Sequence, residues 1–255
     1  MSHFFKAKII DINGLIYVII DEYDHFANEL LSFNLQLFQD SISKNGFVRK
    51  WYEVLKEATE TSVRKIFATG VSLITLDSLT SGFNIGKNIT RSPKLNEMMG
   101  FTEEEVTWLI GQTLSKGTIT EQMLVTMKRY YNGYLFSEKG ENRVFNSDMI
   151  LYYLSSLYEL REPSELLLDM NIASDYGKLG RLMRLKSPES NIAVLKNIVY
   201  SGEISSQITP QFSMEKEVSQ DDFTSLLFYL GLFTIKQAIP GEILLHIPNY
   251  VIRGL

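Results

Sequence analysis

The sequence predicts an α/β protein in which a small parallel sheet is followed by a mainly helical region. Three observations support this fold class. Residues 15–20 form an uninterrupted run, Leu-Ile-Tyr-Val-Ile-Ile, which is typical of a strand buried on both faces. A second strand pattern spans residues 64–72, and a helical pattern lies between the two. After about residue 75 helical patterns predominate, until the chain ends in a helix and a hairpin.

The composition limits the class of protein. Of the 255 residues, 45% are hydrophobic and 22% are charged, which are ordinary values for a folded globular chain. There is no cysteine, which excludes disulfides and thiolate zinc sites, and the three histidines lie far apart. The net charge of −5 argues against a surface that coats nucleic acid, because phosphate binding requires clustered Lys and Arg. The chain has neither a membrane-span pattern nor a signal-peptide pattern, so we expect a cytoplasmic protein.

The first 72 residues contain the elements of a βαβ unit. After the first strand, residues 26–38 and 47–58 carry apolar side chains at helical spacing. The second strand, 64–72, is expected to end at Gly70. Strand, helices and strand in this order predict two parallel strands joined by a right-handed crossover.

The region from 73 to 100 is rich in Ser, Thr, Asn and Gly, which predicts a loop with short pieces of structure. A helix begins after Thr102, because Thr102 and Glu105 have the spacing of a capping box. Two more helices are predicted to begin near residues 121 and 147.

The last segment changes pattern again. A helix stops at Gly231, and two strands at 232–236 and 243–247 are joined by a turn at residues 239–242. A helix followed by a hairpin resembles the end of a winged-helix module.

Two acids, Asp21 and Glu22, directly follow the first strand. Ligands bind at the carboxyl ends of strands in open α/β sheets. An ATPase needs two acids there, one to hold Mg²⁺ through its waters and one to orient the attacking water. Aliphatic residues followed by Asp-Glu form the arrangement called Walker B. The structural alternative is a strand end whose acids cap the following helix, and we expect this capping role for Asp24.

Several ordered motifs resemble a family of AAA-ATPase-like proteins that is common in gut bacteria. These motifs are IYVIIDEYDHFANELL, KIFATGVSLITLDSLTSGFN, NEMMGFTEEEV, YYNGYLFS and VFNSDMILYYL. The resemblance covers about residues 9 to 253. It implies a partial P-loop-NTPase-like core in residues 1–80, a helical lid in 81–186 and a winged-helix-like segment in 187–255. In this family a PD-(D/E)XK nuclease domain usually follows, and the chain stops close to where it would begin.

The resemblance also implies roles for individual residues. Asp21 matches the acid that holds Mg²⁺, and Glu22 matches the acid that acts on water. Thr69 falls where such ATPases place a sensor of the γ-phosphate, with Ser72 as a second candidate and a simple strand-to-loop turn as the structural alternative. Arg91 is a candidate sensor or finger arginine, or else a solvated loop residue. The motif Asn132-Gly133-Tyr134 is expected to form a structural turn.

A phosphate-binding loop, Gly-x-x-x-x-Gly-Lys-Ser/Thr, is missing from the sequence. Residues 81–90 contain Gly82, Gly86 and Lys87, but three residues separate the glycines and Asn88 stands where Ser or Thr is required. We therefore expect a fragment or degenerate member of the family, for which Mg-ATP is the implied cofactor but which does not hydrolyse ATP alone.

Two alternatives remain open: a non-enzymatic module that binds protein, and a DNA-binding regulator that acts through the winged-helix-like segment. From residue 187 onward four cations stand against seven acids, a balance of −3 that disfavours DNA. A truncated sheet is expected to expose an edge or an apolar face. We therefore expect self-association, or a partner chain that supplies the phosphate loop, and no membrane partner.

Overall fold

We analysed a computed structural model of the 255-residue chain. The structure describes residues 6–12, 15–24, 46–70, 85–113, 121–160, 188–210 and 219–254, together with positions 37, 40 and 41. The chain divides into two compact units. The first unit contains Met1–Lys87 and Thr209–Val218, and the second contains Asn88–Ile208 and Ser219–Leu255. The predicted helix at 26–38 lies almost entirely outside the described residues.

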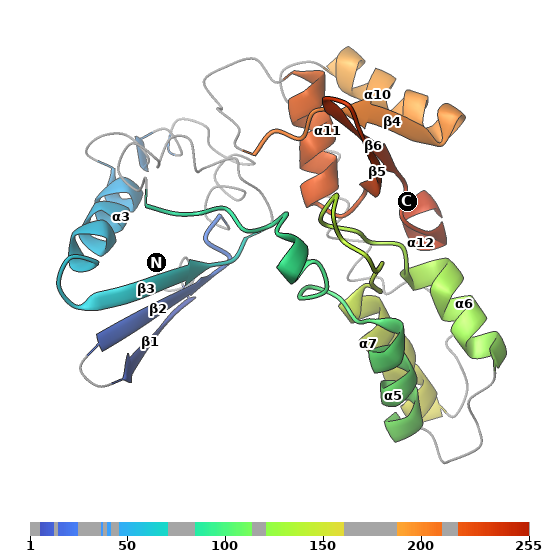
Figure 1. The fold of residues 1–255 in the computed structure, drawn as a ribbon, viewed down its shortest axis with the longest axis horizontal. Helices are drawn as coiled ribbons and strands as arrows, with labels where there is room; N and C mark the ends of the chain where they lie inside the picture. Colours follow the sequence, from blue (N-terminus) through green and yellow to red (C-terminus); the bar gives the residue numbers. More distant parts are fainter. Residues whose placement is uncertain are drawn as a thin grey trace. The chain divides into compact units, whose positions relative to one another are not determined.

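The first unit contains a three-stranded sheet with the order β1-β2-β3 (Figure 1). Strand β2, Leu15–Asp21, pairs in parallel with β3, Val63–Ala68, and helix α3, Phe47–Ala58, lies between them in sequence. The predicted βαβ unit is therefore confirmed. The sheet is mixed, however, because β1, Lys6–Ile12, pairs antiparallel with β2. No pattern in the sequence had indicated β1.

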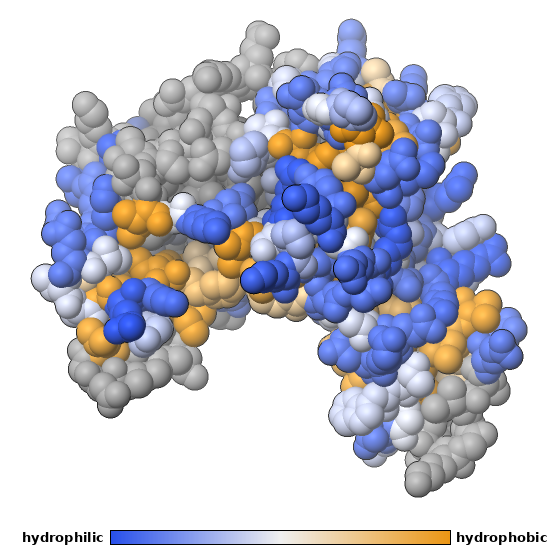
Figure 2. Space-filling view, in the orientation of Figure 1, coloured by the Kyte–Doolittle hydropathy of each residue, from blue (hydrophilic) through white to orange (hydrophobic). Residues whose placement is uncertain are grey.

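Strand β2 is buried on one face only. Val18 and Ile20 are buried, and each such side chain contributes roughly 1.5–3 kcal/mol to stability. On the opposite face Ile19 is 38% exposed, and its cross-strand neighbour Phe67 is 39% exposed. Figure 2 shows hydrophobic atoms at the surface in this part of the first unit. The predicted burial on both faces is wrong, because an uninterrupted aliphatic run does not reveal which face is covered.

The three predicted helices of the second unit are all present. They are α5, Glu103–Thr113, α6, Glu121–Tyr131, and α7, Ser147–Leu160, and a short 3₁₀ helix, η1, spans Pro93–Leu95. The capping box at the start of α5 is confirmed. The Thr102 backbone N–H donates to Glu105 Oε2 at 2.8 Å, and the Glu105 N–H donates to Thr102 Oγ1 at 3.3 Å.

These helices share one hydrophobic core with the C-terminal helix α12, Tyr250–Gly254. Buried side chains from each helix meet in this core, among them Ile110, Met127, Tyr131, Ile150, Tyr153 and Ile252. The core thus joins segments that lie more than a hundred positions apart. None of the described helices is both long and apolar enough to cross a membrane.

The C-terminal part of the second unit contains an antiparallel sheet with the order β4-β6-β5 (Figure 1). Helix α10, Pro188–Ser201, precedes β4, Glu203–Ser206. Helix α11, Gln220–Tyr229, precedes the hairpin of β5, Thr234–Ile239, and β6, Glu242–His246. The predicted helix and hairpin are confirmed, although β5 begins two residues later than predicted.

Two glycines explain how this segment turns. Gly231 adopts a φ of 74° just after α11, and Gly241 adopts a φ of 81° in the two-residue turn between β5 and β6. Glycine adopts this left-handed conformation without the steric cost that a Cβ imposes. The sequence predicted both turns, the first from Gly231 and the second from residues 239–242 between two strand patterns.

Candidate functional site

The candidate site lies where the two parallel strands of the first unit end. The strand register places Ile20 opposite Ala68, so that Asp21 and Thr69 follow side by side. The Thr69 hydroxyl group donates a hydrogen bond of 2.6 Å to Asp21 Oδ1. Both residues therefore lie at the carboxyl edge of the sheet, which is where ligands bind in open α/β sheets.

Backbone hydrogen bonds extend the pairing beyond the end of the strands. The Thr69 N–H donates to the Ile20 carbonyl oxygen at 2.9 Å, and the Tyr23 N–H donates to the Thr69 carbonyl oxygen at 2.9 Å. Thr69 is thus fixed by its backbone on both sides and by its hydroxyl group. The position of its side chain beside Asp21 follows from this bonding.

Glu22 adopts an unusual backbone conformation, with a φ of 52°. Among the described residues it is the only non-glycine residue with a positive φ. This conformation costs an L-residue roughly 1–2 kcal/mol, because Cβ approaches the following carbonyl oxygen. The conformation ends strand β2 at Asp21, and the Glu22 side chain is exposed to solvent.

Asp24 lies close to the candidate site but is almost fully buried, with 1% of its surface exposed. Its carboxylate packs against Gly70, where a Cβ atom would lie only 2.5 Å from Asp24 Oδ1 and 2.4 Å from the Tyr23 ring. Tyr52 of α3 is also buried; burial raises the pKa of its hydroxyl group, and the nearby charge of Asp24 raises it further. The helix that Asp24 was expected to cap lies outside the described residues.

The other two predicted site residues are Ser72 and Arg91. Ser72 is outside the described residues. Arg91 belongs to the second unit and forms an ion pair with Glu138, and burial lowers the pKa of its guanidinium group. With Gln207 and the β5–β6 turn, Arg91 and Glu138 line an open pocket of about 420 Å³.

The oxygen atoms at the strand ends fit the chemistry of Mg²⁺. This cation prefers hard oxygen ligands, and it is usually held by one or two carboxylates together with waters and substrate phosphates. Asp21 and Glu22 supply two carboxylates. In the part of the chain that the structure describes, no three His, Cys, Asp or Glu side chains converge as a metal cluster. Two carboxylates at this edge are ligands of the kind that Mg²⁺ takes together with waters and phosphate oxygens.

The part of the chain that contains these strand ends resembles a known protein family. Residues 1–80 match the model of a family described as "Predicted AAA-ATPase". Residues 1–80 are therefore similar to this family, and the match covers less than half of the chain. The match includes Asp21, Glu22 and Thr69. Comparison with curated proteins and with solved structures found no match.

The resemblance to this family also singled out Asn132, Gly133 and Tyr134, which form a tight turn in the second unit. Gly133 has a φ of 116°, and a Cβ atom there would lie 2.2 Å from the Pro248 carbonyl oxygen. The Asn249 side chain donates to the Asn132 carbonyl oxygen at 3.1 Å. The motif therefore joins the end of α6 to the segment before α12, as expected of a structural turn.

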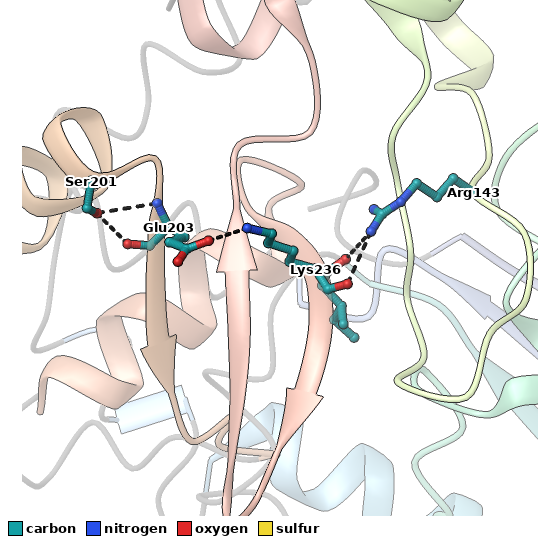
Figure 3. Close-up of polar contacts among 5 residues, drawn as sticks. Arg143, Ser201, Glu203 and Lys236 are labelled. Carbon is teal, nitrogen blue, oxygen red and sulfur yellow. Dashed lines mark hydrogen bonds and ion pairs between the residues drawn. The ribbon is translucent and has the colours of Figure 1, made fainter.

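Sequence reasoning missed Arg143, which connects this turn to the antiparallel sheet (Figure 3). Its guanidinium group donates to the Gly133 carbonyl oxygen at 2.7 Å and to the Ile235 carbonyl oxygen at 2.9 Å. Figure 3 also shows Lys236 of β5 reaching across β6 to Glu203 of β4, the other edge strand. No sequence signal marks Arg143, because its partners are backbone atoms up to 93 positions away.

Proposed function

We propose that the AAA-ATPase-like region carries the Walker B half of a magnesium-nucleotide site. In this proposal Asp21 holds the waters of a Mg²⁺ ion, Glu22 orients the attacking water, and Thr69 contacts the γ-phosphate. Ser72 remains a candidate for a further phosphate contact, and the role of Arg91 stays a prediction of the resemblance. The observation that carries the proposal is the 2.6 Å hydrogen bond between Thr69 and Asp21, because it brings the two polar groups together at the ligand-binding edge of the sheet.

We further propose that this chain does not hydrolyse ATP by itself. The sequence contains no Gly-x-x-x-x-Gly-Lys-Ser/Thr pattern, whose backbone amides and lysine hold the β- and γ-phosphates. Without these groups, the described strand ends present two carboxylates to a polyanionic nucleotide, and like charges repel. The chain is thus proposed to be a fragment or degenerate relative of an ATPase, and Mg-ATP binds tightly only with a partner that supplies the phosphate loop.

The sheet of the first unit offers a surface for such a partner, or for a second copy of the chain. Ile19 and Phe67 are neighbours on its open face, and strand alternation puts Asp21 and Thr69 on the same face. Parallel strands are normally covered on both faces. A partner seated on this face would therefore lie beside the candidate site.

A non-enzymatic interaction module is the second candidate function. The order β4-β6-β5, with α10 and α11 before the hairpin, fits a winged-helix-like module. Helix α10 exposes Val199 at 63% and Tyr200 at 88%, which favours contact with protein. The balance of −3 from residue 187 onward disfavours contact with DNA phosphates.

The Walker B proposal can be tested by adding Mn²⁺, a paramagnetic substitute for Mg²⁺, to the ¹⁵N-labelled full chain. We expect the amide signals around Asp21 and Thr69 to broaden first at millimolar Mn²⁺. The variant Asp21→Asn should lose this local broadening, whereas Glu104→Gln, in the acidic first turn of α5, should keep it. Broadening at Asp21 that persists in Asp21→Asn would contradict the proposal.

A further inference from the structure

The conformation of Glu22 requires an explanation. A glutamate held at a φ of 52° relaxes to a negative φ unless its neighbours fix the chain on both sides. Strained residues of this kind occur where the surrounding structure determines the backbone, and they are concentrated at functional sites. The question is which contacts hold Glu22.

The contacts before and around Glu22 come from Thr69. Asp21 accepts the Thr69 hydroxyl hydrogen at 2.6 Å, and the Tyr23 N–H donates to the Thr69 carbonyl oxygen at 2.9 Å. These two bonds fix the residues on either side of Glu22 to one point of the neighbouring strand end. They leave the direction of the chain after Tyr23 undetermined.

Asp24 determines that direction. It is 1% exposed, and its Oδ1 lies so close to Gly70 that a Cβ atom at Gly70 would be 2.5 Å away. A buried carboxylate is costly unless polar groups surround it, so its position is strongly specified. Asp24 therefore connects the turn after β2 to the end of β3.

We propose that Asp24 is a positioning residue, whose buried carboxylate against Gly70 holds Glu22 in the left-handed conformation at the end of β2. The role of Glu22 toward water rests on the proposed function, whereas the mechanical coupling between positions 22 and 24 does not. In this conformation Glu22 lies outside strand β2, which ends at Asp21. The two consecutive carboxylates therefore do not point to opposite faces of the sheet, as the side chains of two consecutive strand residues would.

A double-mutant cycle tests the coupling. Glycine relieves left-handed strain and alanine does not, so the comparison of Glu22→Gly with Glu22→Ala isolates the backbone strain. In the otherwise unchanged chain, urea unfolding should give Glu22→Gly a folding equilibrium constant roughly three- to fivefold larger than that of Glu22→Ala. In the Asp24→Asn background this advantage should disappear or reverse, because Glu22 is free to relax.

The proposal would be overturned if Glu22→Gly were more stable than Glu22→Ala by the same amount in both backgrounds. It would also be overturned if Glu22→Gly were no more stable than Glu22→Ala in the otherwise unchanged chain. If Asp24→Asn fails to fold, Gly70→Ala disturbs the same contact, because the new methyl group would lie 2.5 Å from Asp24 Oδ1, and it should reduce the advantage. The Mn²⁺ experiment keeps the two proposals distinguishable. Failure of Mn²⁺ to bind at Asp21 contradicts the Walker B proposal, whereas a cycle without coupling contradicts the positioning role of Asp24 alone.

Discussion

The Thr69 hydroxyl group donates a 2.6 Å hydrogen bond to Asp21 across the ends of two parallel strands, 48 positions apart in sequence. This bond is the geometric basis of the candidate site. It leads to the first prediction, because it can be removed without changing the shape of the side chain.

We expect Thr69→Val to lower the free energy of unfolding by about 1 kcal/mol, since it removes one hydrogen bond to a carboxylate at a solvent-exposed position. Thr69→Ser keeps the hydroxyl group and should lose less than half of that. Urea denaturation of both variants measures the difference. Equal stability of Thr69→Val and the unchanged chain would mean that the bond contributes nothing in solution.

A second prediction concerns Gly133 in the turn after α6. Gly133→Ala should cost more than about 3 kcal/mol, because the new methyl group meets the Pro248 carbonyl oxygen and the φ of 116° is strained for alanine. Gly241→Ala is the matched control. Gly241 also has a positive φ, but nothing lies within 4 Å of its Cβ position, so it should cost only about 1 kcal/mol. Similar losses at the two positions would contradict the close contact.

A third prediction concerns His246, whose lowered pKa should make the stability of the fold depend on pH. The pKa of its imidazole is lowered from 6.5 to about 4, first by burial and then by the charges of Arg143 and Lys236, against the opposing effect of Glu203. The unfolded chain therefore binds a proton at higher pH than the folded chain does. Stability is fully present above pH 6.5 and is lost as the pH falls toward 4.

The loss should amount to between about 1 and 3 kcal/mol for this partly buried group. His246→Phe lacks the titrating group. The difference in unfolding free energy between the unchanged chain and His246→Phe should therefore change over this pH window. A difference that is constant from pH 7 to pH 4.5 would show that His246 is protonated equally in both states.

The exposed pair of Ile19 and Phe67 predicts self-association through the open face of the sheet. Light scattering should give a mass above 29.2 kDa that rises with concentration. Ile19→Lys should shift the protein toward the monomer, whereas Val54→Lys, at an exposed apolar position on helix α3 and not on the sheet, should not. A monomer at high concentration in the unchanged chain would count against this expectation.

Local patterns were sufficient to predict most of the regular elements. The aliphatic runs predicted β2 and β3, the capping box at Thr102 predicted the start of α5, and the glycine at 241 predicted the hairpin turn. Each of these signals depends on a few consecutive residues. The parallel pairing followed from the order of strand, helix and strand.

Contacts between distant segments could not be predicted in this way. Arg143 binds carbonyl oxygens, which every residue has, so its sequence context does not reveal its partners. Arg91 is paired with Glu138, and that pairing depends on how the loop before η1 folds. The positive φ of Glu22 was equally hidden, because glutamate has no local preference for it.

The central proposal is that Asp21 and Glu22 belong to half of a magnesium-nucleotide site. The most direct test measures Mn²⁺ broadening of the amide signals around Asp21, first without ATP and then with ATP in excess over the metal. The half-site predicts local broadening without ATP, and recovery of the signals when ATP removes the metal into solution. Broadening that persists or spreads with ATP, and that Asp21→Asn abolishes, would mean that the chain holds a complete nucleotide pocket and would contradict the account.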